Sequence, residues 1–115
     1  MPRGISLTNF ISWNTDNKNT LYRRDLETGD IVHVMTINSM YRLHVLDGGM
    51  FAVSGGWFDK HGLSPFVTTI AGCTFGGSMI NITAIAACGL CIEFGNRVRT
   101  SCIRKVIILH HSNIN

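Results

Sequence analysis

The chain has 115 residues, a net charge of +3, 45% hydrophobic residues and only 15% charged residues. This length suits a single domain, and the composition excludes an intrinsically disordered chain, which combines low hydrophobicity with high charge. Twelve glycines without a three-residue period and only two prolines also exclude collagen-like and proline-rich chains.

Residues 1–29 are predicted to be an irregular polar arm that precedes a domain over residues 30–115. The arm is rich in asparagine, which hydrogen-bonds to the local backbone and favours turns. It has no apolar stretch typical of a secretion signal. We therefore expect a cytoplasmic protein with reduced thiols.

From Gly29 onward, short runs rich in Val, Ile, Thr and aromatic residues alternate with glycine pairs. Short strands separated by turn residues are typical of an all-β sandwich or barrel. We predict an antiparallel barrel or sandwich of seven to eight short strands, with no amphipathic helix. The predicted strands are residues 31–36, 41–46, 50–54, 66–70, 79–84, 88–94, 97–100 and 103–109. No segment is long and apolar enough to span a bilayer, so no membrane partner is expected.

The first predicted hairpin turns at residues 37–40, which pairs Val34 with Leu43 on an apolar face. The same register places His33 opposite His44 on the other face. Two imidazoles hold a divalent metal when a third ligand joins them, so these histidines are a candidate metal site. The alternative is a pair of solvated histidines on the outer face of a sheet.

A second hairpin is predicted to turn at Gly95 and Asn96. A three-residue loop that includes Arg97 pairs Phe94 with Val98, and it pairs Glu93 with Arg99. This register separates apolar from polar side chains better than a two-residue loop. It places Arg97 at the left-handed position that glycine usually takes.

Small polar side chains gather at the predicted strand ends. Hydroxyl and amide groups beside glycines suit a ligand cleft, although they equally satisfy the backbone of loops. The candidate ligand-binding residues are Asn38, Ser39, Tyr41, Arg42, Ser78 and Thr100. The spacing of Cys88 and Cys91 also permits metal binding, whereas two cysteines that pack as small hydrophobic residues are the alternative.

The chain lacks the usual catalytic sequence frames. There is no nucleophile elbow, no phosphate-binding Walker loop, no dinucleotide fingerprint and no zinc-protease motif. Glu27 and Glu93 are the only glutamates, which leaves little for paired acid–base chemistry. These absences favour a non-enzymatic protein without deciding against an enzyme, and no cofactor is expected.

Four motifs follow one another in a fixed order. They are T-x-N-S-x-Y-R at residues 36–42, V-x-G-G at 53–56, G-x4-G-S at 72–78 and V-x-T-S-x-I at 98–103. Together they resemble a family of small bacterial proteins of unassigned function. The resemblance covers about residues 29–107 and implies a compact β fold without an established activity. Cys73 and Cys102 depart from the pattern.

The sequence best fits a non-enzymatic binding or structural module that forms a homo-oligomer, because its surplus of apolar residues leaves exposed apolar patches. A metal-binding protein that uses the His33 and His44 pair is one alternative. The other is a small nucleic-acid-binding barrel with Tyr41 or Trp57 as stacking platforms. Its basic residues would be Arg42, Arg97, Arg99, Arg104 and Lys105.

Overall fold

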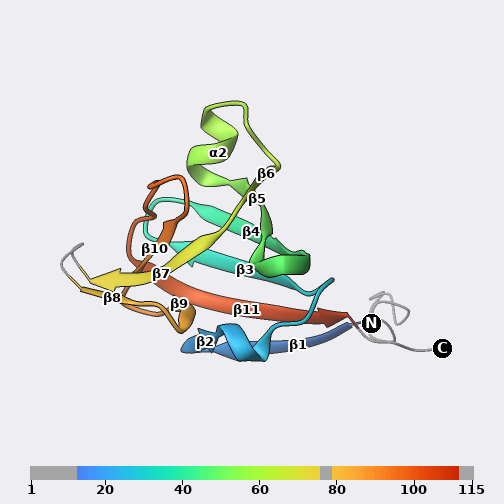
Figure 1. Ribbon diagram of the computed structural model, residues 1–115. Helices are drawn as coiled ribbons and strands as arrows, with labels where there is room; N and C mark the ends of the chain where they lie inside the picture. Colours follow the sequence, from blue (N-terminus) through green and yellow to red (C-terminus); the bar gives the residue numbers. More distant parts are fainter. Residues whose placement is uncertain (1–12, 76–78, 112–115) are drawn as a thin grey trace, which may run out of the picture.

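The computed structural model describes residues 13–75 and 79–111, and this part of the chain is all-β, as predicted (Figure 1). Its largest sheet has six antiparallel strands in the order β1-β11-β3-β4-β5-β6. These strands are β1 (Trp13–Lys18), β11 (Ile103–His111), β3 (Ile31–Thr36), β4 (Met40–Val45), β5 (Phe51–Gly55) and β6 (Phe66–Thr68).

Two smaller sheets complete the fold. One has the order β10-β7-β8, from Cys91–Phe94, Ile70–Phe75 and Met79–Asn81, and the other pairs β2 (Thr20–Tyr22) with β9 (Ala84–Ala87). The helical segments are η1 (Arg23–Asp25), η2 (Asp47–Gly49) and α2 (Gly56–Lys60). No ladder joins one sheet to another in the described residues, so the arrangement is sandwich-like and the closed-barrel alternative is wrong. None of the helices described is long and apolar enough to cross a membrane.

Side chains from all three sheets form one hydrophobic core. Strand β4 shows how the sequence produces it: Tyr41, Leu43 and Val45 are buried, whereas the residues between them are exposed. Alternate side chains of a strand point to opposite faces, so a period of two gives this sheet an inner apolar face and an outer polar face. Every residue of β9 is buried, which fits its run of alanine and isoleucine.

The predicted register of the first hairpin is wrong by two residues. His33 pairs with Arg42, and His44 pairs with Ile31, so the two histidines are not directly opposite each other. The turn lies at residues 36–39 because the Thr36 amide donates to the Ser39 carbonyl at 2.8 Å, and the Ser39 amide donates to the Thr36 hydroxyl at 3.0 Å. A shift of two residues leaves every side chain on the same face, so burial does not distinguish the two registers.

The predicted register of the second hairpin is confirmed. The Phe94 amide donates to the Val98 carbonyl at 2.8 Å, and Glu93 bridges Arg99. Arg97 has a φ of 72°, the left-handed conformation that the three-residue loop requires. The Arg99 and Glu93 side chains form an ion pair at 3.8 Å.

The prediction of an irregular arm is wrong for residues 13–25, and residues 1–12 lie outside the described residues. Strand β1 pairs with β11 over its whole length, and β2 pairs with β9. Backbone pairing along the edge of β11 needs no apolar period in β1, which explains why the sequence pattern did not reveal this strand. Leu21 of β2 is fully buried.

Other predicted strand boundaries differ from the structure. The predicted strands 66–70 and 79–84 each contain a break, and residues 97–100 contribute only one isolated bridge. Residues 88–90 form a turn before β10, and α2 was not predicted. This helix has only five residues, of which Phe58 alone is buried. A segment of this length is too short to show a helical period in the sequence.

Thr36→Val tests the turn that sets the register of the first hairpin. The substitution removes a hydroxyl that bonds Ser39 and accepts from Ser101 at 2.7 Å, and partly buried polar groups lose their partners. We expect the free energy of unfolding to fall by about 1–3 kcal/mol. Denaturant unfolding measures this change, with Thr69→Val on an exposed residue as the control. Equal stability of the two variants contradicts this account of the turn.

Candidate functional site

Several of the predicted ligand-binding residues take part in structural hydrogen bonds, through the backbone or through the side chain. The backbone N–H of Asn38 donates to the Ser101 hydroxyl at 3.2 Å, and Ser39 contributes its backbone to the turn described above. The Thr100 hydroxyl accepts from the Ile92 amide at 3.0 Å and donates to the Ser101 carbonyl at 2.8 Å. Thr100 is also buried, so it is not available to a ligand.

Tyr41 is buried as well, on the inner face of the sheet. Its hydroxyl accepts a hydrogen bond from the Trp57 amide at 3.2 Å, and its ring occupies the space that a Cβ at Gly56 would need. This contact places α2 at the end of β5. Ser78, the remaining hydroxyl of the predicted set, lies outside the described residues.

Arg42 and both predicted histidines lie on the outer face of the six-stranded sheet. Arg42 pairs directly with His33 of β3 on one side and with Ser54 of β5 on the other. His44 follows Arg42 by two residues on the same face of β4. The structure therefore brings together the predicted residues Arg42, His33 and His44, although not in the predicted register.

Two adjoining hollows follow this face, and both are lined by Arg42 and Ser54. The first has a volume of about 490 Å³ and reaches Ser39, Asp59 and Lys60. The second has a volume of about 240 Å³ and is also lined by His44, Ala52 and Pro65. We refer to the two hollows together as the Arg42 groove.

The charge of Arg42 is not neutralised by a carboxylate in the described part of the chain, where the ion pairs are those of Arg99 with Glu93 and of His110 with Asp30. Asp59, at the edge of the groove, accepts from the Ser64 hydroxyl at 2.5 Å and from the Gly55 amide at 2.9 Å. These two hydrogen bonds lower the pKa of Asp59. The carboxylate is thus ionised at neutral pH and already bonded within its own loop.

Burial and the charge of the neighbouring Arg42 both change the pKa of His33. Partial burial lowers the pKa of His33 below 6.5, and the positive charge of Arg42 lowers it further. The folded protein therefore binds a proton at His33 less readily than the unfolded chain. Its contribution to stability is present above pH 6.5 and is lost as the pH falls below that value.

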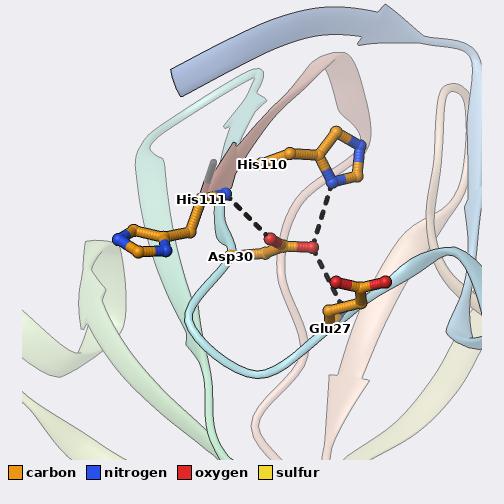
Figure 2. Close-up of polar contacts among 4 residues, drawn as sticks. All are labelled: Glu27, Asp30, His110 and His111. Carbon is orange, nitrogen blue, oxygen red and sulfur yellow. Dashed lines mark hydrogen bonds and ion pairs between the residues drawn. The ribbon is translucent and has the colours of Figure 1, made fainter. Parts of the chain in front are cut away.

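A second polar cluster joins the end of β11 to the loop before β3 (Figure 2). Asp30 is only 2% exposed, and its carboxylate accepts from the Glu27 amide at 2.9 Å, the His111 amide at 3.1 Å and His110 Nδ1 at 3.1 Å. The second ring nitrogen of His110 faces away from Asp30 (Figure 2). Because Asp30 has three donors, the cluster satisfies a buried carboxylate and clamps the end of β11 to this loop.

The four cysteines are free thiols. Burial raises the pKa of Cys73 to about 11 and also raises the pKa of Cys91, so both are protonated at neutral pH. Cys88 lies in a turn, and its thiol is 3.6 Å from the Arg104 carbonyl. Within residues 13–75 and 79–111, no three His, Cys, Asp or Glu side chains are grouped so that they could hold a metal ion. The metal-site predictions for His33 with His44 and for Cys88 with Cys91 remain predictions.

The structure also bears on the residues predicted to bind nucleic acid. Tyr41 is only 4% exposed and presents no face for base stacking. Trp57 stacks on His61, with ring centroids 4.0 Å apart. Arg99 is paired with Glu93, whereas Lys105 is exposed on β11.

Ser54 and Lys60 line the groove but were not among the candidate residues predicted from the sequence. Ser54 lies at an outward position of the predicted strand 50–54, so its alternation with Val53 was a usable signal. Lys60 gave no such signal, because it reaches the groove only through α2.

No protein-family model, curated protein or solved structure matches the chain. The resemblance to a family of small bacterial proteins therefore stays a prediction. The function has to be argued from the geometry and charge of the site.

Arg42→Gln tests the electrostatic coupling in the groove. Removal of the guanidinium charge should raise the pKa of His33, which burial still keeps below its ordinary value. An NMR titration of the His33 ring protons measures this shift, with Arg104→Gln, an exposed residue of β11, as the control. An unchanged His33 titration in Arg42→Gln contradicts the coupling.

Proposed function

We propose that this protein is a non-enzymatic binding module that takes an anionic ligand in the Arg42 groove. The observation that carries this proposal is the unneutralised guanidinium of Arg42 in a groove that also contains Ser54 and Lys60. A guanidinium group presents a planar fork of donors that matches the oxygens of carboxylates and phosphates. A bound anion would supply the negative partner that the described residues do not give to Arg42.

The position of the groove favours binding over catalysis. Its donors lie on paired strands, whose backbone holds them at fixed separations. The Asp59 carboxylate accepts from both Ser64 and Gly55 at Oδ1, which holds it within its own loop. The groove therefore presents donors in fixed positions, an arrangement that suits recognition.

Sulfate is a simple probe of this proposal, because it is an anion without hydrophobic groups. We expect Arg42→Gln to weaken sulfate binding about tenfold or more, since hydrogen bonds to charged groups contribute roughly 1.5–3 kcal/mol. Isothermal titration calorimetry at low ionic strength measures the affinity. Arg104→Gln should retain the wild-type affinity. Equal weakening by the two substitutions would indicate a nonspecific charge effect and would contradict the assignment to Arg42.

We also propose that the module forms a homo-oligomer through the edge strand β8 and the exposed apolar residues beside it. Residues 62–92 contain no Asp, Glu, Lys, Arg or His. Phe75, Ile80 and Ile82 are 70%, 45% and 64% exposed, and β8 is the last strand of its sheet in the described residues. An uncharged apolar edge strand pairs readily with an equivalent strand. A second copy offers a strand with the same apolar and uncharged character.

Ile80→Lys combined with Ile82→Lys tests this association. Each lysine would place a charge in the proposed contact, so the oligomer should dissociate to monomers. Size-exclusion chromatography with light scattering measures the mass. Val67→Lys, at an exposed position of β6 in another sheet, is the control and should not change the mass. A wild-type chain that is monomeric at high concentration contradicts the proposal.

A further inference from the structure

We infer that the anion bound in the Arg42 groove is a tetrahedral dianion, the phosphate group of a small phosphomonoester, and that His44 of the groove and His33, which lies beside Arg42 on β3, complete its binding site. This inference rests on the proposed anion-binding function. It goes further because it names the chemical class of the ligand and assigns a role to each histidine.

Candidate hydrogen-bond donors surround Arg42 on the outer face of the sheet. They come from three neighbouring strands: His33 from β3, Arg42 and His44 from β4, and Ser54 from β5. Neighbouring strands lie about 4.8 Å apart, and alternate residues of one strand lie about 7 Å apart. Arg42 is therefore flanked by donors on both sides and along its own strand. A tetrahedral oxyanion directs oxygens to several donors at once, whereas the guanidinium fork alone occupies both oxygens of a carboxylate.

The charges of the groove favour a doubly charged ligand. Its lining residues carry two positive charges, on Arg42 and Lys60, and one negative charge, on Asp59, whose carboxylate accepts from Ser64 and Gly55. The outer face continues with positive charge, because Lys105 of β11 lies on the His33 side of the sheet, opposite Met35. Three positive charges, on Arg42, Lys60 and Lys105, and one negative charge, on Asp59, leave a net charge of +2, which a dianion balances better than a singly charged ligand does.

His33 faces side chains from both neighbouring strands. Its partner on β4 is Arg42, and its partner on β11 is Ile107. The titratable residues among its diagonal neighbours on this face are His44 on β4 and Lys105 on β11. None of these four residues is acidic, so the described neighbours give protonated His33 no counter-charge. A bound dianion supplies it, and binding should therefore be accompanied by proton uptake.

The size of the groove suits a small ligand. The larger hollow has a volume of about 490 Å³ and is bounded by residues of α2, and the smaller one, of about 240 Å³, is bounded by Pro65. This space accommodates a phosphate group with a small substituent. Tyr41 lies beneath the sheet, so the groove lacks the aromatic platform that binds the bases of a single-stranded nucleic acid.

The test compares anions of different shape and source. Calorimetry at about pH 8 and about pH 6 would use sulfate and malonate, dianions that differ in shape. Because phosphate itself titrates near pH 6, sulfate separates the titration of the protein from that of the ligand. Glycerol 3-phosphate and an unphosphorylated thymidine oligonucleotide then distinguish a small phosphomonoester from a phosphodiester backbone.

The expected result is sulfate binding that depends on Arg42, is stronger than malonate binding, and tightens roughly fivefold or more at the lower pH. His33→Gln and His44→Gln should each reduce this pH dependence. His61→Gln, which changes a histidine that stacks on Trp57 outside the groove, should leave it unchanged. Glycerol 3-phosphate should bind more tightly than the oligonucleotide. Circular dichroism confirms that each variant is folded.

Contrary results separate the inference from the proposed function. Arg42-dependent binding that does not change with pH, or that favours malonate, overturns the inference and leaves an anion-binding module. Tighter binding of the oligonucleotide than of glycerol 3-phosphate overturns it as well, because the occupant is then a nucleic acid. If no anion binds in an Arg42-dependent manner, the proposed function fails too.

Discussion

Val32, Leu43 and Val53 lie side by side across β3, β4 and β5, and each is fully buried against the residues of the smaller sheets. Burial of these three side chains forces their neighbours in the sequence onto the opposite face, because alternate residues of a strand point to opposite sides. Arg42 is one such neighbour, because the burial of Leu43 next to it in β4 turns the Arg42 side chain outward. The outer face thus carries its charged and polar groups as a direct consequence of how the inner face packs.

Two polar clusters keep this arrangement in register. Thr36 and Ser39 close the turn between β3 and β4, and Ser101 ties that turn to the segment before β11. At the opposite end of β3, Asp30 bonds the backbone of His111 and the ring of His110 at the end of β11. Both ends of β3 are therefore fixed. A strand held at both ends cannot slip, and a slip of one residue would turn His33 toward the core.

The sequence predicted strand faces and hairpin register correctly where the order of apolar and charged residues allowed only one arrangement. The alternation in residues 40–45 predicted the buried and exposed faces, and the pairing of Glu93 with Arg99 predicted the register of the second hairpin. The register of the first hairpin was not determined, because two alternatives place the same side chains in the core. Strand β1 escaped notice because its pairing with β11 is made by backbone groups. The groove could be predicted only in part: Arg42 and the histidines were recognised, whereas Lys60 depends on a helix without a sequence period.

A crystal soaked with selenate tests the central claim most directly, because the anomalous signal of selenium locates a tetrahedral dianion without assumptions about the protein. The account predicts a selenium peak on the outer face of the sheet, within hydrogen-bonding distance of the Arg42 guanidinium and the Ser54 hydroxyl. A groove without selenium in a crystal that binds selenate elsewhere would contradict it.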